Sequence, residues 1–439
     1  YDAGGAMTLG VQNTLIGGLA GDALTTGGDS VAIGYSALGT EDTASRTVAI
    51  GYLALAAQNS ALANTYNVAV GFSAGKDVTD GIENTLIGGN AADGLTTAKE
   101  CTLIGANTAA GQIVTGNQNT SLGRYTLHNL TDGVGNTAIG SQAMLTGIVT
   151  GDYNVAIGHK ALTTEDAHGR NVAIGRNALY YLNAGADAYN VAVGYEAGLA
   201  LSTGTENVLV GGLAGDALTT GSWNVAVGHN ALSTEDAHGK NTAIGRHALM
   251  MLNAGADGNN TAVGFKAGEA MSTGIQNTLI GSDAGDALTT GANNIAIGYK
   301  ALSTDDTGHG SVAIGSFALE DQDSGNLYNV AVGFSAGSEV TSGTANTLIG
   351  GYAGDALTTG EYNVAIGRSA LSTEDAYGYN VAIGAFALLN QDAGDNAFNV
   401  AVGYQAGTAI TTGINNTLIG GNAGDAITTS SQNVALGSS

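Results

Sequence analysis

The sequence contains no proline, one cysteine and few aromatic residues, although it is 439 residues long. Aromatic residues make up 5% of the chain and charged residues 11%, so neither an aromatic-rich core nor a helical surface held by ion pairs is expected. The single cysteine, Cys101, excludes an internal disulfide framework and a zinc site built from cysteines. No apolar run approaches the roughly 18 residues that indicate a transmembrane helix, so membrane insertion of this segment is not expected.

Basic residues are also scarce. Lys and Arg together number 12, against 37 Asp and Glu, which gives a formal net charge of −25 at pH 7. A chain of this charge repels phosphate backbones and anionic bilayers, so nucleic acid is not expected as a partner. The acidic charge is expected either to keep a long, exposed object soluble or to hold a weak atmosphere of divalent cations.

Glycine and small apolar residues are abundant, and they are arranged in a repeat. A five-residue motif ending in Gly occurs 25 times, mostly at a spacing of 17 residues and otherwise at 18–20. It begins with Asn in 21 units and continues with a β-branched residue, usually Ala, and then Ile, Val or Leu. Alternation with a period of two and β-branched residues predicts a strand. The repeats run from end to end, so residues 1–439 are expected to form one continuous repeat domain.

The spacing predicts an all-β fold, a parallel β-solenoid with about 17 residues per turn and 25 turns. Each turn should hold a strand of about five residues, a Gly bend, a second short strand carrying Ala-Leu, and a polar return loop. The β-branched motif residues and the Ala-Leu pair are expected to fill the interior. The Asn residues are expected to hydrogen-bond from turn to turn as a structural ladder. Its predicted members are Asn13, Asn67, Asn84, Asn154, Asn171, Asn190, Asn207, Asn224, Asn241 and Asn277.

A longer period of four turns is superimposed on the first. The segment "GDALTTG" or a close variant returns at 21–27, 215–221, 285–291, 354–360 and 424–430. The middle motif residue, usually Ala, becomes Leu about once in four turns, and strand alternation is expected to point it away from the interior. These leucines are therefore predicted to pack between chains of a homotrimer: Leu15, Leu86, Leu209, Leu279, Leu348 and Leu418. Residues 101–150 depart most from the repeat and are the candidate recognition region.

The segments "NVAIGRNAL", "NTAIGRHAL" and "NTLIGGLAGDALTTG" resemble the head repeats of YadA-like trimeric adhesins. They are more similar still to the "NTAIG-x-x-AL" repeats of bacteriophage tail fibres, over essentially the whole chain. The resemblance implies a left-handed β-roll wound as a trimer. Both ends of the sequence fall inside a repeat, so we expect a segment of a longer fibre polypeptide or subunits that join end to end.

Residues with chemical potential are few, and each has a structural alternative. Loop histidines such as His168 and His238 recur four turns apart, too far to share a metal within one chain. Paired carboxylates are suited to acid/base work or Ca²⁺ binding, but are expected here to form a solvated edge. The pairs are Glu41-Asp42, Glu165-Asp166, Glu235-Asp236, Asp305-Asp306 and Glu374-Asp375.

Exposed side chains suggest two further alternatives. Thr pairs such as Thr219-Thr220 would suit ice binding only if they recurred in nearly every turn, and they do not. Tyrosines that precede several motifs are suited either to stacking on glycans or to packing between turns. They are Tyr66, Tyr153, Tyr189, Tyr328 and Tyr362.

The sequence therefore predicts a non-enzymatic, extracellular fibre without catalytic residues, metal sites or cofactors. The first hypothesis is a structural or adhesive bacteriophage tail fibre, on the virion surface, whose partners are further copies of itself and a host or surface receptor such as a glycan. The alternative is a trimeric adhesin head or self-assembling filament on a bacterial cell surface. A carbohydrate-processing spike is a third hypothesis, which would require carboxylates gathered in a groove.

Overall fold

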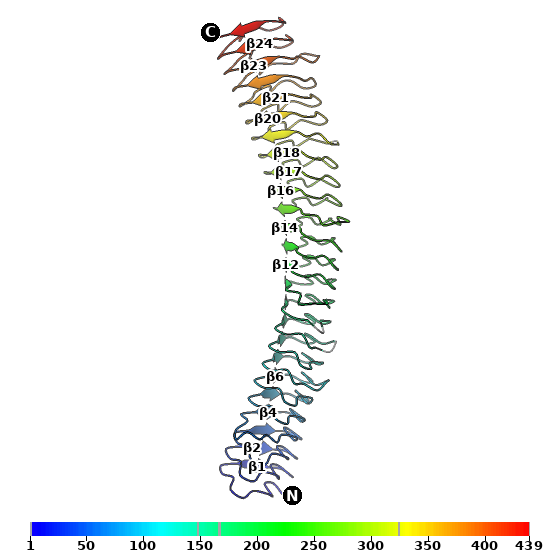
Figure 1. Ribbon diagram of the computed structural model, residues 1–439, viewed down its shortest axis with the longest axis vertical. Coiled ribbons are helices and arrows are strands. Elements are labelled where there is room, and N and C mark those ends of the chain that lie inside the picture. The colour runs from blue at the N-terminus through cyan, green and yellow to red at the C-terminus, as the bar shows by residue number, and fades with distance from the viewer. Residues whose placement is uncertain (1, 147–148, 166–167, 324, 439) are drawn as a thin grey trace. The chain divides into compact units, whose positions relative to one another are not determined.

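A computed structural model describes residues 2–146, 149–165, 168–323 and 325–438, and each turn of the chain contributes one short strand (Figure 1). The predicted all-β solenoid, with 25 parallel strands and about 17 residues per turn, is confirmed. The chain divides into two compact units, Tyr1–Ser222 and Trp223–Ser439. Asp166 of the second acidic pair lies outside the described residues.

The strands occur once per turn in both units. Unit 1 contains β1 (Thr14–Ile16), β2 (Val31–Ile33), β3 (Val48–Ile50), β4 (Val68–Val70), β5 (Thr85–Ile87), β6 (Thr102–Ile104), β7 (Thr120–Leu122), β8 (Thr137–Ile139), β9 (Val155–Ile157), β10 (Val172–Ile174), β11 (Val191–Val193) and β12 (Val208–Val210). Unit 2 contains β13 (Val225–Val227), β14 (Thr242–Ile244), β15 (Thr261–Val263), β16 (Thr278–Ile280), β17 (Ile295–Ile297), β18 (Val312–Ile314), β19 (Val330–Val332), β20 (Thr347–Ile349), β21 (Val364–Ile366), β22 (Val381–Ile383), β23 (Val400–Val402), β24 (Thr417–Ile419) and β25 (Val434–Leu436).

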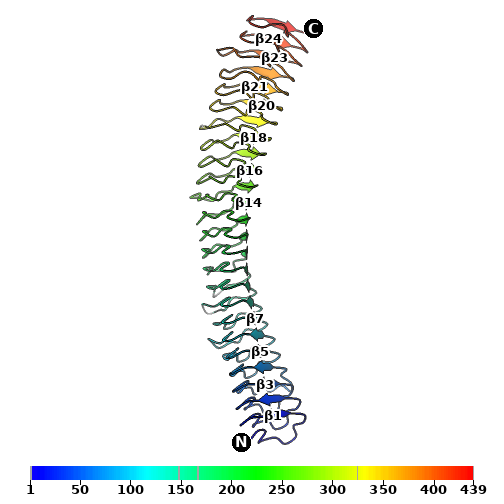
Figure 2. The same ribbon diagram turned by 180° about the vertical axis from the view of Figure 1, so that it is seen from behind.

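Equivalent residues of successive turns stack on one another. In unit 1, β10 pairs in parallel with β11, and Ala173 lies opposite Ala192. In unit 2, Ala365 of β21 lies opposite Ala382 of β22. The arrows of β14 to β24 accordingly form one column in both views of unit 2 (Figures 1 and 2). Each motif thus begins a new turn directly against the previous one.

The two faces of each strand are the reverse of the prediction. In β22, Ala382 is fully buried, whereas Val381 and Ile383 on either side of it are partly exposed. The same pattern recurs in most strands, so the expectation that the β-branched residues fill the interior is wrong. A coil of about 17 residues leaves a narrow interior, and an Ala column fits there where two columns of Val and Ile would not.

The strands are three residues long rather than five, and the segment carrying Ala-Leu is a turn, not a second strand. In the turn after β17, Lys300 and Leu302 both adopt left-handed backbone angles, with φ of 53° and 54°. Leu302 is nonetheless fully buried, and its N–H donates to the Ala318 carbonyl of the next turn at 3.0 Å. The predicted interior place of the Ala-Leu pair is confirmed, and burial of the Leu offsets its unfavourable backbone angle.

Candidate functional site

The asparagine column joins the turns by hydrogen bonds, mainly between a side chain and the backbone. Asn346 donates its backbone N–H to Oδ1 of Asn329 at 2.9 Å, and its own Nδ2 donates to the Gly360 carbonyl at 2.8 Å. The amide therefore satisfies backbone groups just outside the strand, where the three-residue ladder ends. All ten predicted asparagines make a turn-to-turn bond of this kind: Asn13, Asn67, Asn84, Asn154, Asn171, Asn190, Asn207, Asn224, Asn241 and Asn277.

The leucines predicted to pack between chains lie inside their own chain, so that prediction is wrong. A Cβ on Gly268 or Gly285 would lie 2.8 Å from a methyl carbon of Leu279, which shows that Leu279 fills the space these glycines leave. Other turns carry Leu at the position of Gly285 and Ala at the position of Leu279, as in Leu302 and Ala296. A turn thus carries its large side chain either in the strand or in the following bend, and the small residue stands at the other position. This alternation explains the four-turn period. The corrected residues are Leu86, Leu209, Leu279, Leu348 and Leu418, all fully buried, and Leu15, which is partly buried.

The first residue of each acidic pair is also buried, so the predicted solvated edge is wrong for these five carboxylates. They are fully or almost fully inaccessible to solvent: Glu41, Glu165, Glu235, Asp305 and Glu374. Each accepts a hydrogen bond from the backbone N–H three residues later, the distances being 2.7–3.2 Å. A buried carboxylate held by backbone donors is a structural corner of the turn, since a lone buried charge would be very costly.

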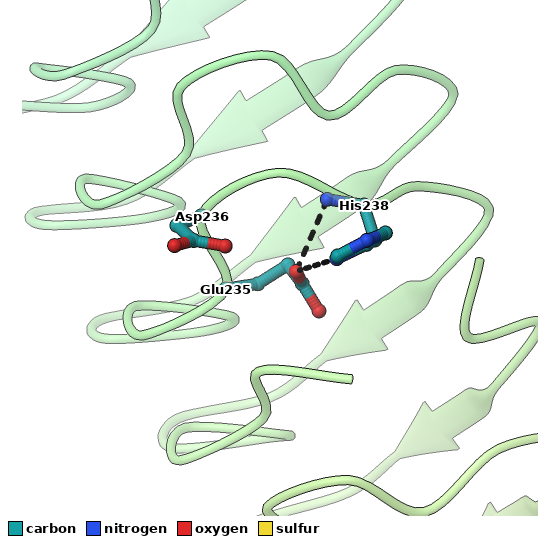
Figure 3. Close-up of side chains that lie close together, drawn as sticks. All are labelled: Glu235, Asp236 and His238. Carbon is teal, nitrogen blue, oxygen red and sulfur yellow. Dashed lines mark hydrogen bonds and ion pairs between the residues drawn. The ribbon is translucent and has the colours of Figure 1, made fainter. Parts of the chain in front are cut away.

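Glu235 shows how such a corner is built (Figure 3). One carboxylate oxygen accepts the backbone N–H of His238 at 3.2 Å and lies 3.5 Å from its Nδ1, and the other oxygen accepts the N–H of Ala254 at 3.2 Å. Ligand atoms of Glu235, Asp236 and His238 lie within 4.8 Å of one another, which is close enough to share a metal ion. However, Ca²⁺ takes about six to eight oxygen ligands, and both oxygens of Glu235 already accept backbone donors. The absence of a resident metal stays a prediction.

A second group of three carboxylates, Glu374, Asp375 and Asp392, lies at a corresponding corner two four-turn periods later in unit 2. Oε2 of Glu374 and Nε2 of Gln391 are both buried without a hydrogen-bond partner among the described residues. In the equivalent corner one four-turn period earlier, Nε2 of Gln322 donates to Oδ2 of Asp305 at 2.8 Å. The unpartnered atoms of the later corner therefore belong to a carboxyl–amide pair that does not close, and the absence of a metal there stays a prediction.

The pKa of Glu374 is raised from 4.5 to about 7, chiefly by burial and in part by the nearby Asp392 and Asp375 charges, while the Tyr377 N–H acts to lower it. Burial also raises the pKa of Asp305, where the Gln322 amide and the Gly308 N–H favour the charged form. The carboxyl that lacks an amide partner is thus the one most easily protonated near neutral pH.

Gln391→Leu is expected to stabilise the chain by about 1–2 kcal/mol, because it removes a buried amide donor that has no partner. The equivalent residues Leu182 and Leu252 already occupy this position in two other corners and are fully buried. Asn399 would lose its bond to Gln391 but keep its 2.7 Å bond to the Gly413 carbonyl. Denaturant unfolding followed by circular dichroism measures the change.

Gln322→Leu is the matched control and is expected to have the opposite sign. It deletes bonds to Asp305 and Ser311 and the acceptor of Asn329, at a cost of about 2–3 kcal/mol. If both substitutions changed stability in the same direction, the two corners would not differ in whether the glutamine amide has a hydrogen-bond partner.

Stability is expected to fall as the pH rises from about 4.5 to about 7. The folded pKa of Glu374 lies above its unfolded value, so its contribution is complete below pH 4.5 and is lost as the folded carboxyl ionises. The full shift corresponds to about 3 kcal/mol. Denaturant unfolding at pH 4.5 and pH 8 tests this, and Glu374→Gln should lose that part of the pH dependence. An equal slope in Glu374→Gln would assign the effect to the general acidic charge of the chain.

The outward residues of the strands form an apolar surface on each unit, which we name the strand face. It comprises the first and third residues of every strand, largely Val, Thr and Ile, stacked in two columns. Ile280, Ile349 and Ile419 are 38–41% exposed, so the columns are open to solvent in a single chain. Soluble proteins rarely expose continuous apolar stripes of this length unless a partner covers them.

The tyrosines that precede the motifs pack between turns. Tyr362 stacks on Tyr379 with ring centroids 5.2 Å apart, and Tyr379 stacks on Phe398 at 5.0 Å. Elsewhere the hydroxyls of Tyr66 and Tyr189 accept hydrogen bonds from Arg46 and Arg170 of the preceding turn. The packing alternative is therefore present in the structure, and a role of these tyrosines as glycan platforms stays a prediction.

The departures from the repeat in residues 101–150 have a packing basis. Ser121, at the middle of β7, is buried with Thr108 and Thr126, which replace the usual Ala. The Thr108 hydroxyl bonds to that of Ser121 and lies 3.0 Å from that of Thr126, so the polar atoms satisfy one another inside the coil. Cys101 is buried too, and burial raises the pKa of its thiol, which makes it a weak nucleophile. Recognition by this region stays a prediction.

The described residues contain no helix long and apolar enough to cross a membrane. No protein-family model matches the chain, and no curated protein matches it. The internal repeats and the geometry built on them are thus the basis on which a function is proposed.

Proposed function

We propose that the chain is the shaft or receptor-binding part of an extracellular trimeric fibre, most like a bacteriophage tail fibre. The strand face is the observation that supports this. It offers an apolar stripe two residues wide along each unit, and a monomer would leave it in contact with water.

The strand face of each chain has two columns of side chains, so each column can pack against a different neighbouring chain. This suits a closed ring in which every chain has two neighbours. Three chains are the smallest such ring, and they leave the least space along the axis for Val, Thr and Ile side chains to fill. Parallel chains in register would place the same turn of all three copies at one level. In such an assembly the interior Ala and Leu residues hold each chain together, and the strand face holds the chains to one another.

The acidic charge and the stacked turns fit a structural role. Twelve basic residues against 37 acidic ones keep separate fibres from associating side by side through charge. Turn-to-turn hydrogen bonds, repeated at each Asn, make a long object without a large globular core. Such a fibre holds a binding surface away from the particle that carries it.

Sedimentation equilibrium of the full chain tests the assembly. We expect a mass three times the 43.2 kDa of one chain. Ile280→Glu with Ile297→Glu should shift the mass toward that of one chain, because like charges would face one another on the strand face. Thr273→Glu with Thr290→Glu adds the same charge at exposed return-loop positions and should leave the mass unchanged. A single-chain mass for the unmodified protein would overturn the proposal.

A further inference from the structure

A groove in unit 1 gathers cationic and aromatic side chains on an otherwise acidic chain. It lies beside the turns that follow β9, β10 and β11 and has a volume of about 240 Å³. His159, Lys160 and Arg176 supply its polar wall, and Tyr180, Tyr181 and Leu199 its apolar wall. Two of the chain's 12 basic residues therefore line one groove.

Aromatic rings, rather than carboxylates, contact the two cations of the groove in the part of the chain that the structure describes. Lys160 and Arg176 form no ion pair there. Instead, Nζ of Lys160 lies 5.9 Å from the ring centroid of Tyr180, and Cζ of Arg176 lies 5.6 Å from that of Tyr195. The rings hold the cationic groups over their faces and leave N–H groups for an anion.

The aromatic wall offers a flat surface beside these cations. Tyr181 is 54% exposed, and it meets Tyr180 edge to face with ring centroids 4.6 Å apart. The half-buried Leu199 lies beside them in the same groove. An exposed, fixed tyrosine next to an apolar side chain suits the apolar face of a sugar ring, while its hydroxyl stays available for hydrogen bonds.

A sister repeat in unit 2 carries a carboxylate of its own at the equivalent place. Residues 154–199 align without gaps to residues 224–269, and His229 and Arg246 repeat His159 and Arg176. Glu269 stands at the position of Leu199. Its carboxylate accepts a bond from Nδ1 of His247 at 2.8 Å and pairs with Nζ of Lys266 at 2.8 Å.

The sister repeat lacks the features that would bind an external ring. Met250 and Met251 replace Tyr180 and Tyr181, and Asn230 replaces Lys160. There the chain's own carboxylate, Glu269, bonds to His247 and Lys266, and methionines stand where unit 1 has the two tyrosines. Unit 1 has Leu199 at the position of Glu269, and its aromatic wall and Lys160 are present. Its own carboxylate, Glu196, stands at the position of Lys266 and accepts a hydrogen bond from Nδ2 of the groove residue Asn177 at 3.2 Å.

We propose that the groove of unit 1 binds an acidic sugar residue, its carboxylate against Lys160 and Arg176 and its ring against Tyr181. This site deepens the proposed fibre role. It rests on that role only for the location of the sugar, which would be on the surface to which the fibre attaches. A long polyanion is disfavoured because the chain's charge of −25 would repel it, so the ligand is one terminal or branch residue of a glycan.

Saturation-transfer difference NMR with two matched probes tests the proposal. Methyl β-D-glucuronide and methyl β-D-glucoside differ only in the carboxylate at C6. We expect saturation of the glucuronide ring protons and about ten-fold weaker binding of the glucoside. Equal binding of the two probes, or binding of neither, would overturn the proposal.

The triple variant Tyr180→Met, Tyr181→Met, Leu199→Glu places the side chains of the sister repeat at three positions of the groove. It is expected to lose the glucuronide signal. Tyr328→Met, which removes an exposed tyrosine of unit 2, should keep it. Undiminished binding in the triple variant would place the ligand elsewhere and refute the assignment.

The sedimentation mass of the same samples separates this result from the proposed assembly. The groove lies within one unit of one chain, so the glucuronide should bind whether or not the chain is trimeric. If the protein is a trimer that does not bind the glucuronide, only the proposed sugar site is refuted. If it is a monomer that binds the glucuronide, only the proposed trimer is refuted.

Discussion

Leu279→Ala is expected to lower the free energy of unfolding by about 3–4 kcal/mol, because it empties the space between two glycines in the interior. Gly285→Leu alone should also destabilise the chain, since its Cβ would lie 2.8 Å from methyl carbons of both Leu279 and Leu288. The double variant Leu279→Ala, Gly285→Leu has the same residues at these positions as the turn that contains Ala173 and Leu179. It should recover about half of the free energy of unfolding lost in Leu279→Ala.

The measurement is a double-mutant cycle from denaturant unfolding, with hydrogen exchange over residues 260–300 to locate the change. Exchange is needed because a chain of stacked turns can open locally without unfolding throughout. We expect a coupling energy of at least about 1.5 kcal/mol in favour of the double variant. If the effects of the two single substitutions simply added in the double variant, the side chains at positions 279 and 285 would not compete for the same interior space.

The repeat predicted the period, the place of each strand and the asparagine ladder, but not which strand face is inside. Alternation with a period of two shows that the faces differ, and it orients them only when one face is polar. Here Ala382 lies on one face and Val381 and Ile383 on the other, and all three are apolar. The useful signal was volume: Leu279 is large where Gly268 and Gly285 are small.

The buried acidic corners were missed for a similar reason. A pair such as Asp305-Asp306 looks solvated because charged residues are seldom fully buried. The signal lay 17 residues later, where Gln322 brings an amide to Asp305 in the next turn. Asp305 and Gln322 are far apart in the sequence, and their contact can be predicted only when one turn is known to stack on the next. The groove of unit 1 depends on the same stacking, since Lys160, Arg176 and Leu199 come from three turns.

Gly350→Ala is expected to be strongly destabilising, as a methyl group would be at the motif glycine of most turns. Gly350 has φ of +133°, a region that only glycine enters readily, and its added Cβ would lie 2.6 Å from the carbonyl carbon and oxygen of Gly367 in the next turn. Backbone strain and this clash together should cost about 4 kcal/mol or more. Hydrogen exchange should rise in β20 and β21, because the turns must separate to admit the methyl group.

Gly351→Ala, one residue along, is the matched control. A Cβ there would meet no atom closer than the Phe334 carbonyl oxygen at 3.9 Å, and the backbone angle is not left-handed. Other turns carry large side chains at this position, including Arg368 and Tyr404. Gly351→Ala should therefore be neutral or stabilise slightly, since Ala restricts the unfolded chain more than Gly does. Two adjacent glycines with opposite responses would place the close contact between turns at the motif glycine, whereas equal responses would mean that the turns do not stack through it.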